Sequence, residues 1–204
     1  MKVVATRNVY TYDELTPDAQ QRALETLCAE AWESLDSWQV AEDLNGWFVY
    51  EATATTPGCL SNKELLDKYG VNILWSVSYS QSDHAAIAGF LRRSDTPNLA
   101  WPEGVDYVRV VTTGYGNHSY PEYVGTADEQ EIYGGKLFQE TADMIQNLNR
   151  KLYRHARDIC DAYTDKEYVL TTYNECHELV RRFTDEGEFA DTAFWTDENG
   201  EGDK

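Results

Sequence analysis

The sequence has little of what secreted, membrane-spanning and metal-binding chains usually carry. Its 204 residues include only four cysteines, and no two of them share the CxxC spacing of a metal or redox motif. Four cysteines are also too few for a disulfide framework in a domain of this length. No stretch approaches the ~20 apolar residues of a membrane-spanning helix, and the first residues lack the apolar run of a signal peptide. We therefore expect a cytoplasmic protein that does not associate with membranes.

Phosphate-binding loops and positive charge are also scarce. Neither the P-loop pattern nor the dinucleotide-binding glycine pattern occurs in the sequence. Lys and Arg total 17 against 36 Asp and Glu, which leaves a net charge of −19. Such a field repels nucleic acid and anionic lipid, and it favours basic partners at a rate that falls with salt. We therefore expect no direct contact with nucleic acid.

Apolar and aromatic residues, in contrast, are plentiful. Hydrophobic residues make up 42% of the chain and aromatic residues 13%. A disordered acidic chain lacks the apolar surface that offsets the entropy of ordering, so this composition indicates a folded protein. We expect one α+β domain over residues 1–196 and a frayed acidic tip over residues 197–204.

The hydrophobic period changes along the chain from helical spacing to a period of two and back again. Thr16 and Pro17 predict the start of a first helix, and Gly70 predicts the end of a short one. Consecutive strands at hairpin spacing predict an antiparallel meander. Helices are expected from Pro17 and over residues 37–44, 62–69 and 137–163, with another from about Lys166; strands are expected over 2–10, 71–79, 84–92, 105–115 and 119–126. The predicted fold is therefore α+β, with an antiparallel β-sheet meander flanked by N-terminal helices and a C-terminal helical hairpin.

Three stretches of the chain share a pattern with one family. Residues 10–23 contain Asp13-Glu14-Leu15-Thr16-Pro17-Asp18-Ala19, residues 75–86 contain Ser80-Gln81-Ser82-Asp83-His84-Ala85, and residues 152–187 end in Phe183-Thr184-Asp185-Glu186-Gly187. Together they resemble a family of uncharacterised proteins encoded by bacteriophages and other mobile elements, some of them labelled antitoxins. Ser82 and His84 stand where that family usually has glycines, which predicts a reshaped turn. The resemblance implies a mobile-element setting and supplies no catalytic residues.

Candidate catalytic residues are few. Asp83 and His84 follow a serine-rich segment, and Ser80 would complete a Ser–His–Asp set. Adjacent residues on an extended segment point to opposite faces, so Asp83 is poorly placed to orient the ring of His84. Cys176 and His177 lie about 100° apart around a helix and do not converge on a metal. We predict no catalytic residues, no metal and no cofactor, and we keep an enzyme that uses the Asp83–His84 turn as an alternative.

One basic cluster lies on the long predicted helix. Arg150, Arg154 and Arg157 share a face of that helix. They suit either contact with nucleic acid or pairing with nearby carboxylates such as Asp158 and Asp161. Because the surrounding negative field opposes phosphate groups, we expect internal pairing.

Dense carboxylates are the remaining functional signal. Duplex DNA presents about one charge per 1.7 Å of its axis, so a rigid acidic surface can occupy a DNA-binding groove. The expected binding residues are Asp128, Glu129, Glu131, Asp185, Glu186, Glu188 and Asp191.

The acidic charge and the resemblance together favour one function. They predict a phage-type accessory protein that inhibits a host nucleic-acid-targeting defence complex, in the manner of an anti-CRISPR or anti-restriction protein. Its partner would be a basic nucleic-acid-binding protein. An antitoxin-like protein that neutralises a toxin is an alternative, and so is acidic charge that serves solubility alone.

Overall fold

The computed structural model describes residues 9–33, 35, 37–77, 83–113, 118–175 and 182–190. Within it the chain divides into two compact units. Unit 1 joins Met1–Leu35 to Asp161–Lys204, and unit 2 comprises Asp36–Cys160. Most of the strand predicted over residues 2–10 lies outside the described residues, as do Ser80, Cys176, His177 and the acidic tip at 197–204.

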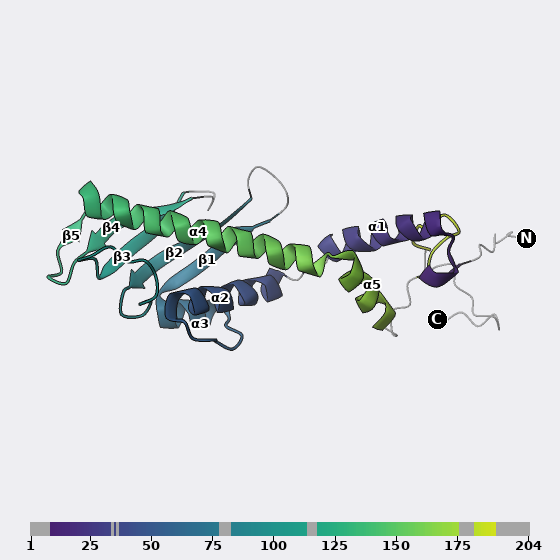
Figure 1. Ribbon diagram of the computed structural model, residues 1–204, viewed down its shortest axis with the longest axis horizontal. Helices are drawn as coiled ribbons and strands as arrows, with labels where there is room; N and C mark the ends of the chain where they lie inside the picture. The colour runs from purple at the N-terminus through teal and green to yellow at the C-terminus, as the bar shows by residue number, and fades with distance from the viewer. Residues whose placement is uncertain are drawn as a thin grey trace, which may run out of the picture. The chain divides into compact units, whose positions relative to one another are not determined.

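Unit 2 is built on a five-stranded antiparallel sheet in the order β1-β2-β3-β4-β5 (Figure 1). Its strands are β1 (Val71–Ser76), β2 (His84–Arg92), β3 (Tyr107–Thr112), β4 (Ser119–Gly125) and β5 (Glu131–Ile132). Its helices are α2 (Ser37–Thr53), α3 (Asn62–Tyr69) and α4 (Gly135–Tyr163), and the last turn of α4 extends into unit 1. The predicted α+β class and antiparallel meander are confirmed, and α5 (Lys166–Glu175) follows α4 as the second of a C-terminal helix pair.

One face of the sheet forms the core of unit 2. Side chains on a strand point alternately to the two faces, and the large buried side chains of the strands fall on one of them. Helix α4 contributes a stripe at helical spacing that includes Ile145, Leu148, Leu152 and Ala156. Burying a Leu or Ile side chain stabilises a fold by roughly 1.5–3 kcal/mol. The core strand residues include Val71, Ile73, Ile87, Leu91, Val108, Val110 and Val124.

Helices α2 and α4 contact each other. The Trp47 ring stacks on the His155 ring with their centroids 5.3 Å apart, and Lys151 forms an ion pair of 2.8 Å with Glu51. The ion pair is largely exposed and contributes little to stability, so the stacked rings are the stronger of these two contacts.

Helix α2 is longer than the sequence predicts. It was expected to end near Asn45-Gly46, but it continues to Thr53. Phe48, Val49 and Ala52 are buried beyond the predicted end, and Asn45 is buried with its amide donating to Leu60 O at 2.9 Å. The tertiary contacts of these residues override the turn preference of an Asn-Gly pair.

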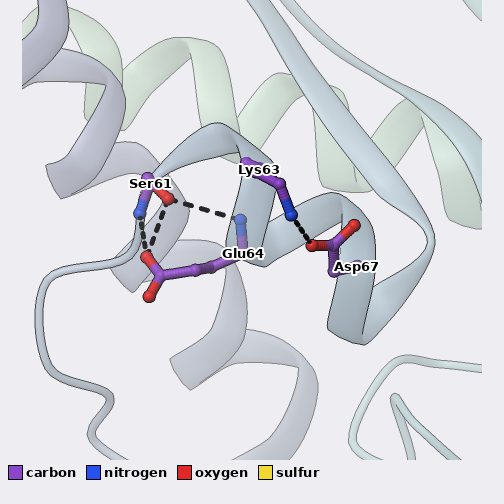
Figure 2. A network of polar contacts seen from close by, with 4 residues as sticks. All are labelled: Ser61, Lys63, Glu64 and Asp67. Carbon is purple, nitrogen blue, oxygen red and sulfur yellow. Dashed lines mark hydrogen bonds and ion pairs between the residues drawn. The ribbon is translucent and has the colours of Figure 1, made fainter.

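Helix α3 begins and ends where predicted because each end carries a specific cap. Ser61 Oγ accepts the backbone N–H of Glu64, and the Glu64 carboxylate accepts the backbone N–H of Ser61 at 2.9 Å (Figure 2). Lys63 and Asp67 form an exposed ion pair one turn apart. Gly70 then ends the helix with φ +73°, a conformation that side chains disfavour.

Unit 1 is a small helical unit around an aromatic core. It contains the 3₁₀ turn η1 (Tyr12–Glu14), helix α1 (Pro17–Glu33) and helix α5, which packs on α1. The buried Phe183 forms isolated β-bridges with Tyr10 and Phe189, so the segment at 182–190 docks on this core. The other core residues include Leu15, Ala19, Ala23, Leu27 and Val169.

None of the described helices combines the length and the apolar character that crossing a lipid bilayer requires.

Candidate functional site

The outer face of the unit 2 sheet carries a row of aromatic rings. Phe90, Tyr107 and Tyr123 occupy the positions that alternate with the buried core residues of β2, β3 and β4. Ring centroids are 5.3 Å apart for Phe90 and Tyr107, and 6.4 Å apart for Tyr107 and Tyr123. Tyr133, just after β5, extends the row at 5.9 Å from Tyr123. The antiparallel register thus brings together four rings that are far apart in the sequence.

The row of rings depends on a glycine. Tyr107 is paired with Gly125 across β3 and β4, and the Tyr107 ring lies directly over it. A Cβ atom at Gly125 would lie 1.9 Å from Tyr107 Cζ. Only glycine therefore lets this ring lie flat against the sheet, where it lies within contact of Tyr123.

Carboxylates surround the exposed end of the aromatic row. Glu122 is the extra residue at a register shift between β3 and β4. Its Oε2 atom lies 3.8 Å from Arg109 Nε. Asp128 and Glu129 lie in the exposed turn between β4 and β5, where Glu129 has φ +58°. Glu131 opens β5 and accepts a hydrogen bond from the Tyr133 hydroxyl.

We call this set the acidic aromatic surface. Its members are Tyr107, Tyr123, Tyr133, Glu122, Asp128, Glu129 and Glu131.

Two phenols of the acidic aromatic surface, those of Tyr107 and Tyr133, respond to the carboxylates around them. The hydrogen bond to Glu131 raises the pKa of Tyr133, and partial desolvation together with the charges of Glu131, Tyr123 and Glu122 raises it further. Partial desolvation raises the pKa of Tyr107, and the carboxylates of Glu131 and Glu129 add to that increase. These groups are therefore close enough for their charges to act together, and the surface favours a cation.

The sequence-predicted binding residues fall into two sets. Asp128, Glu129 and Glu131 belong to the acidic aromatic surface of unit 2. Asp185, Glu186 and Glu188 are exposed on the loop at 182–190 in unit 1. Arg22 Nε donates to Glu186 O at 2.5 Å, which ties this loop to α1. Asp191 lies outside the described residues.

Sequence reasoning missed the tyrosines of the acidic aromatic surface. Tyr107 and Tyr123 fell in predicted strands, where aromatic side chains are common, and Tyr133 fell outside every predicted element. The available signal was their alternation with buried valines: Tyr107 precedes Val108, and Tyr123 precedes Val124. That pattern places both tyrosines on the face opposite the core.

The alternative catalytic residues also have a defined place. Asp83 precedes β2 and His84 opens it, and both line a pocket of unit 2 together with His118. Ser80, which would complete the Ser–His–Asp set, lies outside the described residues. Among residues whose placement is described, no three His, Cys, Asp or Glu side chains gather as a metal site.

No protein-family model, curated protein or solved structure matches this chain.

Proposed function

We propose that this chain binds a basic, nucleic-acid-binding protein through the acidic aromatic surface and so competes with nucleic acid for it. The observation that carries the proposal is the arrangement of Glu122, Glu129 and Glu131 around three neighbouring tyrosine rings of the outer sheet face, with Asp128 in the adjoining exposed turn.

The chemistry of the surface supports a cationic protein partner. Arginine and lysine side chains bind carboxylates, and they also bind the faces of aromatic rings. The surface offers both kinds of acceptor side by side. Tyrosine is enriched among the residues that dominate binding energy at protein interfaces, because it combines a large apolar ring with a polar tip. A basic groove that normally holds a phosphate backbone presents the complementary groups.

Several side chains of the acidic aromatic surface are exposed, so a partner protein can reach them. The Tyr133 side chain is 66% exposed, and Glu129 and Glu131 are exposed beside it. Partners steered by opposite charge associate rapidly at low salt, and the association slows as salt is added. Nucleic acid, which carries the same sign of charge as the surface, is repelled from it.

Inhibition of a host nucleic-acid-targeting defence complex is the biological setting that we propose for this contact. The resemblance to phage and mobile-element proteins motivates that setting, and the charge of the surface supplies a physical route to it. A protein that covers the DNA-binding groove of such a complex would block the complex without any chemistry of its own.

Affinity purification of the tagged full chain tests the proposal. The bait is incubated with an extract of a bacterial host that carries nucleic-acid-targeting defence systems. We expect recovery of a basic nucleic-acid-binding protein that is released by about 1 M salt, where the Debye length falls to about 3 Å. Duplex DNA should release the same protein at low salt.

Two other outcomes would contradict the proposal. Recovery of a small toxin-like protein that duplex DNA does not displace would favour the antitoxin alternative. Recovery only of partners that resist high salt would show that apolar contacts, and not the carboxylates, hold the complex.

A further inference from the structure

The unit 2 sheet opens at one end. β2 pairs with β1 over residues 84–89. Its pairing with β3 covers only residues 89–92, and within the described residues no strand pairs with residues 84–88 on that side. A gap therefore separates the first half of β2 from the strands that follow.

Asn149 of α4 fills the floor of this gap. Its Oδ1 accepts the backbone N–H of Ile87 at 3.1 Å, which satisfies a donor that a continuous sheet would have paired with β3. Its Nδ2 donates to Ser119 Oγ at the start of β4. One side chain thus connects β2 to β4 and stabilises the separation of the strands, because an unpaired buried N–H costs about 1–3 kcal/mol.

The gap forms a pocket of about 540 Å³, within the range that small-molecule sites occupy. His84 of β2, His118 before β4 and Arg150 of α4 line it, so three different segments each contribute a nitrogen-bearing donor. Asp83 is the one carboxylate that lines the pocket among the described residues. Tyr120 and Tyr153 add ring surface.

Arg150 departs from the sequence-based expectation. We expected it to pair with nearby carboxylates such as Asp158 and Asp161, but it is in no ion pair within the described residues. Its guanidinium is exposed at the pocket and is available to a ligand. An always-charged, planar donor in a pocket suits the recognition of phosphate or carboxylate oxygens.

We propose that this pocket binds a small phosphomonoester of nucleotide size. Arg150, His84 and His118 would donate to the phosphate oxygens, and the rings of Tyr120 and Tyr153 would contact the organic part. This site and its ligand are independent of the acidic aromatic surface and of its partner.

Phosphate fits the donors better than a single carboxylate does. A guanidinium and two imidazoles supply several N–H donors from three directions, and a phosphate monoester presents three oxygens and up to two negative charges to them. The overall negative charge does not prevent this contact. At an ionic strength of 0.15 M, charges farther apart than about 8 Å are largely screened, so the nearby donors determine the local potential.

Nuclear magnetic resonance of the full chain with labelled histidine rings tests the proposal. The probe is adenosine 5′-monophosphate, compared with inorganic phosphate, citrate and adenosine at equal ionic strength. We expect the ring signals of His84 and His118 to shift on addition of the nucleotide. The ring of His155, which stacks on Trp47 outside the pocket, serves as an internal control and should not shift.

Comparing the four ligands separates the contribution of the phosphate group to binding from that of the organic part. The nucleotide should bind more tightly than inorganic phosphate, because it also contacts the tyrosine rings, and adenosine alone should bind weakly. Citrate that binds as tightly as the nucleotide would overturn the choice of phosphate in favour of carboxylates. The absence of any selective shift of His84 and His118 would overturn the site itself.

A matched pair of variants on α4 completes the test. Arg150→Gln removes the guanidinium at the pocket, and Arg154→Gln removes the same charge from an exposed position that does not line it. Arg150→Gln should weaken nucleotide binding about 10-fold or more, as expected for a lost charged hydrogen bond, while Arg154→Gln should change it less than about 2-fold. Equal effects of the two variants would show that net charge, and not the pocket, governs binding.

Discussion

Tyr107 lies with its ring across the backbone of Gly125, so close that a Cβ atom there would be 1.9 Å from Tyr107 Cζ. Gly125→Ala should therefore displace the ring and disturb its contact with Tyr123. We expect the free energy of unfolding to fall by about 1–3 kcal/mol, as for other substitutions that overfill a packed site. Urea denaturation measures the change.

A double-mutant cycle isolates this contact. In a Tyr107→Ala background the ring is absent, so Gly125→Ala should cost much less than it does in the wild-type chain. The same cost in both backgrounds would mean that the alanine disturbs the strand by itself, independently of the Tyr107 ring.

The hydrogen bond between Tyr133 and Glu131 gives a second prediction. Because that bond is the largest cause of the raised pKa of Tyr133, Glu131→Gln should lower this pKa towards the usual 10.0. Glu188→Gln removes an equal charge in unit 1 and should leave Tyr133 unchanged. Titration of the Tyr133 ring carbon by nuclear magnetic resonance measures both. An unchanged pKa in Glu131→Gln would contradict the described contact.

Asn149 gives a prediction about the sheet gap. Asn149→Leu removes the acceptor of the Ile87 N–H, so the variant should lose about 1–3 kcal/mol of stability. The Ile87 amide should also exchange faster with solvent. Gln146→Leu, one turn earlier on α4 and exposed, should leave that exchange rate unchanged. Equal protection of the Ile87 amide in wild type and Asn149→Leu would show that another group satisfies this donor.

His155 should make the stability of the fold depend on pH. Burial against Trp47 lowers the pKa of the folded imidazole, although the charges of Asp158 and Asp43 partly oppose this. The unfolded chain therefore takes up the proton first as the pH falls. The free energy of unfolding should decrease as the pH drops below about 6.5, until the folded imidazole also protonates. Well above pH 6.5 the imidazole is neutral in both states, so His155 should not make stability depend on pH there.

The variant His155→Phe keeps a ring on Trp47 and removes the titration. Its stability should fall less than that of the wild type between about pH 7 and pH 5.5, as measured by urea denaturation across that range. Identical slopes for the two proteins would contradict a lowered pKa in the folded state.

Local signals accounted for the parts of the fold that were predicted correctly. Ser61, Glu64 and Gly70 fix the ends of α3 through side-chain and backbone caps that the sequence displays. The strand at 84–92 was predicted with its observed ends. Helix α2 passed its predicted end because Phe48, Val49 and Ala52 beyond that end are buried by tertiary contacts, which local sequence signals do not display.

The candidate sites required information that local patterns do not carry. His84 and His118 reach one pocket only because β2 and β4 separate around Asn149, and nothing near either histidine indicates that gap. The row from Phe90 to Tyr133 likewise depends on strand register and on the register shift between Arg109 and Val110. Composition predicted an acidic binding surface, but the aromatic part of that surface comes from tertiary structure.

The most direct test of the proposed function compares two variants of equal net charge against the purified basic partner. One carries Asp128→Asn, Glu129→Gln and Glu131→Gln on the acidic aromatic surface. The other carries Asp185→Asn, Glu186→Gln and Glu188→Gln on the loop of unit 1. Isothermal titration calorimetry measures the affinity of each variant and of the wild type for the partner.

Binding through the acidic aromatic surface predicts that the first variant loses about 10-fold or more in affinity, equivalent to about 1.4 kcal/mol, and that the second stays within about 2-fold of the wild type. Equal losses in the two variants, or a larger loss in the second, would contradict it.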